Sequence, residues 1–304
     1  MKKKIFYVMT LIALSGTASC DDNDEPQNDP ASNAPGMAGT VSDTITIDMD
    51  ALPTPAAVAE AIWDAYAQGY TKFAMKGSYE KLGCRELGLA SMTNLWSPFT
   101  DMERVLLIDL TGVTGFPEVE AEPGVFMPEL NINLGDYLYE IRLPEEVQVL
   151  ASEIDSYVRK LSMPGVVHAK YYTLTPPQLY SVDAPKLKSV EGSIGLAQTV
   201  SSISFPSLTD FGEGFAKYSS NVKVDTLKLT AKGSFTMTYT EYNHLQEPIS
   251  FGTFYSIDTE SCTLYLHQDK KTDGGGSPAA AGNQWAGETW KKIVFTDDNG
   301  NATE

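Results

Sequence analysis

The sequence predicts a strand-dominated α/β protein: a solenoid whose repeated units share one parallel β-sheet, with a helix and a strand capping its N-terminal end. The unit is clearest in residues 200–229, where Ile203/Phe205 and Leu227/Leu229 alternate as in two short strands. The segment between them suits a turn and an irregular coil, and not a full helix. Such a unit has one apolar face and nothing of its own to cover it, so a copy must stack on each side.

Copies of this unit recur over residues 105–295. Their pattern is Φ-x-x-Φ-x-Φ, where Φ is apolar, followed by a turn that often holds proline. The strand positions Ile108, Ile141, Leu174, Ile203, Leu227 and Leu264 are spaced by 33, 33, 29, 24 and 37 residues. A leucine-rich repeat has roughly 20–29 residues, so the longer units are expected to carry insertions. Because the period is loose, a β-sandwich with alternating strands stays an alternative.

Two segments near the C-terminus carry a family resemblance. Phe-Gly-Glu-Gly-Phe at 211–215 precedes the Leu227/Leu229 strand, and Phe-Gly-Thr-Phe at 251–254 precedes Cys-Thr-Leu-Tyr-Leu at 262–266. With the closing Trp-Lys-Lys-Ile at 290–293, they resemble the bacterial BspA-like leucine-rich-repeat surface lipoproteins over about residues 105–295. Here His267 replaces the proline of the family pattern, and the loop 269–282 is unusually long. The resemblance implies the repeat fold and a non-catalytic, adhesin-like surface protein.

The N-terminus has the features of a lipoprotein leader. Three lysines precede the apolar run 5–14, and small residues lead to Cys20. This pattern predicts a signal peptide over 1–19, with lipidation of Cys20. The resemblance to surface lipoproteins implies anchoring in the outer membrane, facing the cell exterior. Plain secretion with an incidental cysteine is the alternative. Residues 20–43 read as a disordered acidic tether. Its acidic start resembles a surface-export signal, although a solvated linker would look the same.

Residues 44–104 are expected to cap the first repeat. Thr44–Met49 has the pattern of a strand. Thr54 and Pro55 mark the start of a helix that Gly69 ends, and Tyr70–Met75 follows as a second strand. A solenoid end without such a cap would expose its core. Residues 296–304 are expected to form a flexible tail.

The charge of the chain excludes two classes of partner. Removing residues 1–19 takes three of the 22 basic residues, which leaves 19 against 40 acidic residues and a formal charge of −21. Nucleic acid and anionic membrane surfaces therefore make poor partners for the mature domain. Cys84 and Cys262 would lie at opposite ends of a solenoid, too far apart for a disulfide, and read as buried apolar residues.

No group of residues in the sequence points to catalysis. His168, His244 and His267 lack metal-ligand spacing, Gly83–Arg85 has no histidine tied to it by a motif, and Gly274–Ser277 lacks the context of a phosphate loop. We therefore expect no enzymatic activity, no cofactor and no metal. Trp63 and Trp290 are expected to pack, whereas Trp96 and Trp285 could be exposed.

The strand alternation also predicts a binding face. If the apolar couplets point inward, the residues between them form an outward row, namely Asp109, Arg142, Ser204, Lys228 and Tyr265. Tyr265 is the best single anchor, because tyrosine is enriched at binding hot spots. The first hypothesis is an extracellular protein ligand bound by this row. The second is a carbohydrate-binding accessory of a glycan-uptake system, with Trp285, Tyr265 and Tyr239 lining a groove. The third is a hydrolase, and the row could also serve only solubility.

Overall fold

The computed structural model describes residues 43–82, 95–96, 98–99, 102–134, 138–151, 158–170, 179–197, 199–212, 214–215, 222–235, 241–242, 248–249, 257–272 and 279–303. All of them belong to one compact unit, Met37–Glu304. The predicted signal peptide, Cys20, most of the tether and Cys84 lie outside the described residues, as do Leu174, Tyr239 and His244. No helix among the described residues is long and apolar enough to span a membrane.

The N-terminal cap has the predicted helix. β1 (Ile45–Asp48) and a short 3-10 turn (Met49–Ala51) lead to α1 (Pro55–Ala67) and β2 (Lys72–Ser78). Thr54 Oγ1 accepts a hydrogen bond from the Ala57 N–H at 3.2 Å, which caps the helix start. Gly69 follows the helix with φ of +96°, a conformation that glycine adopts without strain. The buried face of α1 consists of Val58, Ile62 and Ala65.

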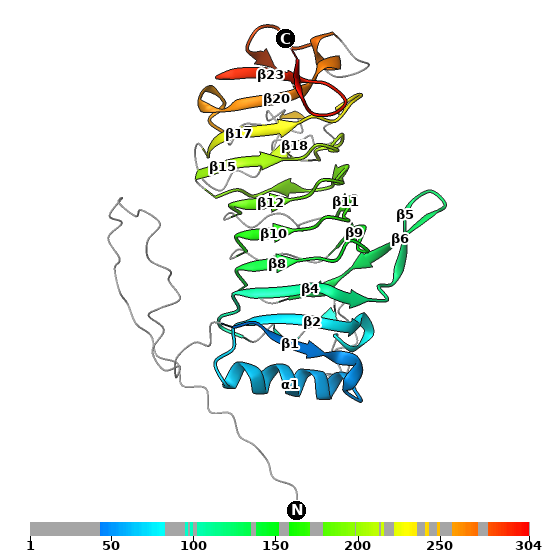
Figure 1. The fold of residues 1–304 in the computed structure, drawn as a ribbon. Coiled ribbons are helices and arrows are strands. Elements are labelled where there is room, and N and C mark those ends of the chain that lie inside the picture. The colour runs from blue at the N-terminus through cyan, green and yellow to red at the C-terminus, as the bar shows by residue number, and fades with distance from the viewer. Residues whose placement is uncertain are drawn as a thin grey trace, which may run out of the picture. The chain divides into compact units, whose positions relative to one another are not determined.

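The main sheet has eleven strands, and Figure 1 shows most of them as a stack of arrows from β1 to β23. Its neighbours follow chain order from β1 to β24, and every pairing is parallel except β23 with β24. The α/β prediction with a parallel sheet and few helices is therefore confirmed. After β1 and β2 the strands are β4 (Leu107–Thr114), β8 (Glu140–Arg142), β10 (Lys160–Ser162), β12 (Ser181–Asp183), β15 (Thr199–Ser204), β17 (Lys223–Leu229), β20 (Thr263–His267), β23 (Lys292–Thr296) and β24 (Ala302–Thr303).

The inward face of the main sheet is a ladder of apolar side chains. Ile141, Ile203 and Leu227 are all buried, as their alternation predicts. Each belongs to one register row of the sheet, so each side chain packs between the side chains of the flanking strands. The row runs through Phe73, Ile108, Ile141, Leu161, Val182, Ile203, Leu227, Leu264 and Ile293.

The predicted spacing of the units is wrong between Ile141 and Ile203. Two strands, β10 and β12, lie there, so the row advances from Ile141 to Leu161, Val182, Ile203 and Leu227 in steps of 20, 21, 21 and 24 residues. Their apolar pattern is weak because Met163 and Ala184 take the second inward positions. The strands are also short, at three residues each, so that few alternating positions mark them.

A second sheet lies in the return segments between main-sheet strands. Parallel neighbours require the chain to cross back after each strand, and β9 (Val149–Leu150), β11 (His168–Ala169) and β13 (Ser189–Val190) occur in these crossings. The sheet continues through the hairpin of β6 (Val125–Leu130) and β5 (Glu118–Glu122), in the order β13-β11-β9-β6-β5. Leu130, Leu150, Ala169 and Val190 share one register row and the common buried core.

Four two-stranded sheets complete the described strands. They pair β3 (Leu95–Trp96) with β7 (Ile132–Asn133), β14 (Ser193–Ile194) with β16 (Gly214–Phe215), β18 (Glu241–Tyr242) with β19 (Pro248–Ile249), and β21 (Gln284–Trp285) with β22 (Glu288–Thr289).

The prediction of a flexible tail over residues 296–304 is also wrong. β24 pairs antiparallel with β23, and Thr296 is buried with its Oγ1 donating to Leu266 O at 3.2 Å. Asp297 Oδ1 accepts hydrogen bonds from the Asn299 and Asn301 N–H groups at 2.9 and 2.8 Å, which shapes the turn between the strands. The chain end thus adds an antiparallel strand to the main sheet.

Candidate binding face and C-terminal polar cluster

The five residues of the predicted outward row lie in one register row of the main sheet. Asp109 pairs with Arg142, and Ser204 pairs with Lys228, which pairs with Tyr265. Sequence reasoning missed two members between Arg142 and Ser204, because it missed strands β10 and β12. They are Ser162 and Asp183, so the row reads Asp109, Arg142, Ser162, Asp183, Ser204, Lys228 and Tyr265.

Arg142 is held in place by two carboxylates. Its Nη2 and Nε lie 2.6 and 2.7 Å from Glu140 Oε1, and its Nη1 lies 3.7 Å from Asp109 Oδ2. Asp109 is itself oriented, because its Oδ1 accepts hydrogen bonds from Thr111 Oγ1 and N–H at 2.6 and 3.0 Å. Arg142 stays exposed despite these contacts. A side chain already fixed in one geometry loses less entropy when a ligand binds it.

The other end of the row combines a cation with an aromatic ring. Lys228 Nζ lies 5.4 Å from the centre of the Tyr265 ring, within the range of a cation–π contact. Lys228 is exposed and Tyr265 is half-buried. Between the two ends, Ser162 Oγ donates to Asp183 Oδ2 at 3.5 Å. The row therefore presents a cationic side chain next to each of its end residues, with hydroxyl and carboxylate groups between the two cations.

A column of aromatic and cationic side chains beside the row was not predicted. Tyr139, Arg159 and Tyr180 directly precede β8, β10 and β12, and the Arg159 guanidinium lies 5.9 and 5.5 Å from the two ring centres. The rings of Tyr139 and Tyr180 are 37% and 45% exposed. Lys160 Nζ also lies 5.8 Å from the Tyr139 ring, which links the column to the outer face. The sequence could have indicated this column only if β10 had been recognised, because Arg159 precedes β10 and lies between the two tyrosines.

The predicted exposure of Trp285 is wrong. Its side chain is only 2% exposed and packs edge-on against Phe235 with ring centres 5.7 Å apart. Trp290, predicted to pack, is buried beside it, and its Nε1 donates to Trp285 O at 3.2 Å. Trp285 therefore cannot line a glycan groove. Trp63, by contrast, is exposed on α1 although packing was predicted.

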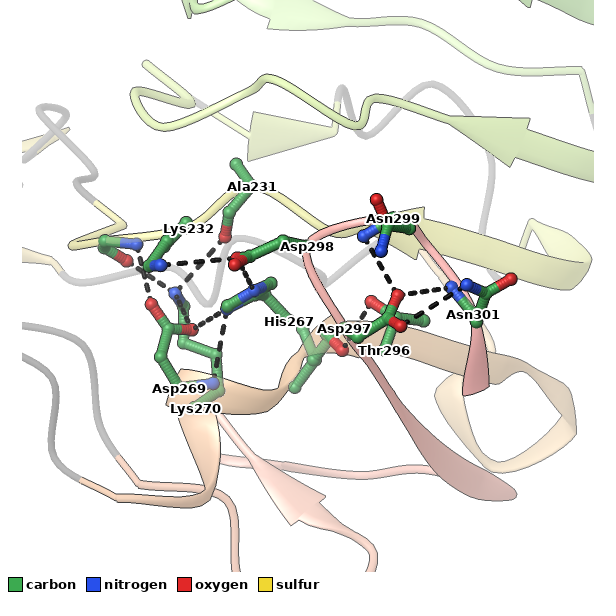
Figure 2. A network of polar contacts seen from close by, with 12 residues as sticks. Ala231, Lys232, His267, Asp269, Lys270, Thr296, Asp297, Asp298, Asn299 and Asn301 are labelled. Carbon is green, nitrogen blue, oxygen red and sulfur yellow. Dashed lines mark hydrogen bonds and ion pairs between the residues drawn. The ribbon is translucent and has the colours of Figure 1, made fainter. Parts of the chain in front are cut away.

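A polar cluster joins the end of β20 to the turn between β23 and β24 (Figure 2). His267, only 3% exposed, lies between two carboxylates: Nδ1 is 2.9 Å from Asp269 Oδ1 and Nε2 is 2.9 Å from Asp298 Oδ1. Lys270 is equally buried, and its Nζ donates to Gly233 O, Asp269 Oδ1 and Ala231 O at 2.5, 3.0 and 3.4 Å. The cluster thus connects three segments, namely residues 231–233, 267–270 and 298.

Asp269 is the electrostatic centre of this cluster. Burial by itself raises the pKa of Asp269, but hydrogen bonds from the Gly233 N–H, Lys270 and His267 outweigh it and hold that pKa at about 2. A folded-state pKa below the ordinary value of 3.8 means that the charged carboxylate stabilises the fold. This stability is present above about pH 4 and is lost as the pH falls towards 2.

We expect Asp269→Asn to lower the free energy of unfolding at pH 7 by about 1.5–3 kcal/mol, the range for hydrogen bonds to charged groups. The loss should shrink as the pH falls from about 4 to about 2, because the native carboxylate is then protonated. Denaturant unfolding at pH 7 and at low pH measures both effects. Asp298→Asn is the control, since Asp298 is two-thirds exposed and its change should be small. An unchanged pH profile in Asp269→Asn would contradict the assignment.

The described residues hold no gathering of three or more His, Cys, Asp or Glu side chains suited to a metal. Cys262 is buried, and burial raises the pKa of its thiol to about 12. Since the thiolate is the reactive form, Cys262 is a poor nucleophile. The candidate binding site is the outer face of the main sheet, which carries Arg142, Lys228 and Tyr265 in one register row.

Comparisons with known proteins do not indicate what this surface binds. No family model, no curated protein and no solved structure matches the chain.

Proposed function

We propose that the chain is a leucine-rich-repeat solenoid of the BspA-like type, a non-catalytic surface lipoprotein that binds extracellular protein ligands through the outer face of its main sheet. The spacing of the strands supports the repeat fold. Steps of 20, 21, 21 and 24 residues from Ile141 to Leu227 match the roughly 20–29 residues of such repeats.

The observation that carries the binding proposal is the composition of the outer face. Arg142 in β8 and Tyr265 in β20 belong to the outward row, and Tyr139, Arg159 and Tyr180 directly precede β8, β10 and β12. Tyrosine and arginine are the residue types most enriched at protein-binding hot spots, together with tryptophan. Their charges and rings are already arranged by contacts within the face, which favours a specific partner over simple solvation.

The cellular location follows from the leader. A signal peptide over 1–19 and a lipid on Cys20 would hold the protein in the outer membrane, and the acidic tether to residue 43 would let the domain face the cell exterior. A formal charge of −21 after removal of residues 1–19 keeps the domain away from anionic membrane surfaces, so the lipid supplies the membrane attachment.

We expect the triple change Arg142→Ala, Lys228→Ala, Tyr265→Ala to weaken ligand binding at least about tenfold, the scale of losing hot-spot residues. Surface plasmon resonance against a panel of purified extracellular proteins, in parallel with a glycan array, gives the readout. The control is Lys186→Ala, Lys188→Ala, because both lysines are exposed and lie outside the row. Thermal unfolding of each variant checks that the fold is kept.

The two assays separate the protein ligand from the glycan ligand. Binding to a purified protein that the triple change abolishes and the control leaves intact supports the proposal. Binding to a glycan, lost on Tyr139→Ala with Tyr180→Ala, favours the glycan-uptake accessory, since exposed rings are suited to stacking against sugars. Binding that survives both sets of changes and follows deletion of residues 269–282 would place the site in the C-terminal loop.

A further inference from the structure

The hairpin of β5 and β6 stands out from the rest of the second sheet. β6 pairs with β9 at Glu129 and Leu130, whereas residues 125–127 of β6 have β5 as their strand partner. Figure 1 shows the two strands projecting to one side of the molecule. One ion pair and one hydrogen bond fix the hairpin: Lys170 Nζ lies 2.5 Å from Glu129 Oε1, and His168 Nε2 lies 3.1 Å from Glu122 Oε1. An isolated hairpin has little stability in water, so these contacts hold it in place.

The hairpin carries the most exposed large apolar side chain of the described residues. Phe126 is 60% exposed and Val125 is 40% exposed. Phe126 lies opposite Glu120, and Glu118 lies on the same face two residues earlier. Both glutamates are exposed, although Glu120 Oε1 also accepts a hydrogen bond from the Gly124 N–H at 2.8 Å. The face is therefore an aromatic ring bordered by carboxylates.

The backbone of β5 is open on its outer side. Among the strands that the structure describes, β5 has β6 as its one neighbour. The Glu129 N–H donates to Pro117 O at 2.8 Å, so residues 117 and 129 form a hydrogen-bonded pair. Because such pairs alternate in antiparallel strands, Glu118 and Glu120 occupy the non-bonded positions. Pro128, which has no N–H, lies opposite Glu118 and fits this assignment. The N–H and C=O groups of Glu118 and Glu120 thus point towards the open edge.

We propose that β5 binds an extended, basic segment of a partner protein, which adds a strand to this edge. The open backbone groups of Glu118 and Glu120 supply the hydrogen bonds, as in other cases of strand addition. Lysine or arginine side chains on one face of the added strand meet the two carboxylates. Their aliphatic stems and charges also reach the Phe126 ring, which adds a cation–π contact. This surface is separate from the row on the main sheet.

Charge decides between a basic partner and a second copy of the chain. Two copies joined at this edge would bring the acidic face of one hairpin beside that of the other, and like charges on adjacent strands are destabilising. An anionic membrane is disfavoured for the same reason. An edge strand with charged side chains also resists self-association. A cationic strand would instead be attracted by the carboxylates of Glu118 and Glu120.

The test uses the full chain and a short synthetic peptide of alternating lysine and threonine, followed by fluorescence anisotropy. We expect this peptide to bind and a peptide of alternating glutamate and threonine not to bind. Raising the salt from about 0.05 to about 0.3 M should weaken binding, because exposed charges are then screened. Glu118→Pro, which removes an edge N–H, and Phe126→Ser should each weaken binding at least about tenfold.

Matched variants make the result specific. Glu118→Gln keeps the edge N–H and removes one charge, so it should weaken binding less than Glu118→Pro. Glu60→Gln removes one exposed charge on α1 and should change nothing. Arg142→Ala with Lys228→Ala should also leave peptide binding unchanged, which separates this proposal from the face of the main sheet. Binding that survives either Glu118→Pro or Phe126→Ser overturns the proposal, as does equal binding of the acidic peptide. A dimer in sedimentation that Phe126→Ser dissociates would overturn it in favour of a second copy.

Discussion

Leu227→Ala is expected to lower the free energy of unfolding by about 2–5 kcal/mol. The Leu227 side chain is fully buried in β17, and its register partners are Ile203 on one side and Leu264 on the other. Truncation removes buried methyl groups and leaves a cavity between Ile203 and Leu264. The lost burial and the cavity both lower the stability. Denaturant unfolding followed by circular dichroism measures the change.

Lys228→Ala is the matched control, because it alters the next residue of the same strand on the outer face. Its effect should be within about 0.5 kcal/mol, as for most exposed positions. Hydrogen exchange in Leu227→Ala should rise first in β15 and β20, whose side chains contact the cavity. Equal destabilisation by the two substitutions would mean that the inward and outward faces are wrongly assigned.

Gly165→Ala is expected to destabilise the fold by about 1–3 kcal/mol or more. A Cβ on Gly165 would lie 1.9 Å from Glu145 O, 2.6 Å from Glu145 C and 2.7 Å from Val147 O. These are backbone atoms of the neighbouring turn, so no side chain can rotate away, and the two turns must separate. Thermal or denaturant unfolding measures the loss.

The turn after Pro144 is one residue longer than the turn after Pro164, and this difference accounts for the crowding at Gly165. Residues Glu145 and Glu146 follow Pro144 before the next buried residue, Val147, whereas Gly165 alone stands between Pro164 and Val166. Lys186→Ala is the control, since Lys186 holds the same place after Pro185, is exposed, and contacts Glu145 through its side chain. It should cost little. A Gly165→Ala variant as stable as the original would show that these turns are not in contact.

The outward row was predictable because alternation along a strand is a local property. Asp109, Arg142, Ser204, Lys228 and Tyr265 each follow an inward apolar residue and share one register row. Ser162 and Asp183 were not predicted, because each of their strands has a single buried apolar residue, Leu161 or Val182. The column of Tyr139, Arg159 and Tyr180 was missed for the same reason. It can be recognised only when the three consecutive strands β8, β10 and β12 are aligned.

The open edge of the hairpin and the polar cluster could not be predicted from the sequence. Glu-Val-Glu-Ala-Glu at 118–122 alternates as a strand does, but nothing in it says which backbone edge stays open. The carboxylate partner of His267, Asp298, lies 31 residues later in the chain. Such a contact depends on the pairing of β20 with β23.

The sequence by itself determined the inward and outward faces of the longer strands, the helix from Thr54 to Gly69, and the strand-dominated class. These follow from side-chain alternation, capping residues and glycine conformations, which act over a few neighbouring residues. The tertiary structure alone decided that β10 and β12 join the sheet, that Trp285 is buried and that Ala302–Thr303 forms the last strand. Those outcomes depend on contacts between distant segments, in which a short or weakly apolar strand is stabilised by the hydrogen bonds and apolar rows of its neighbours.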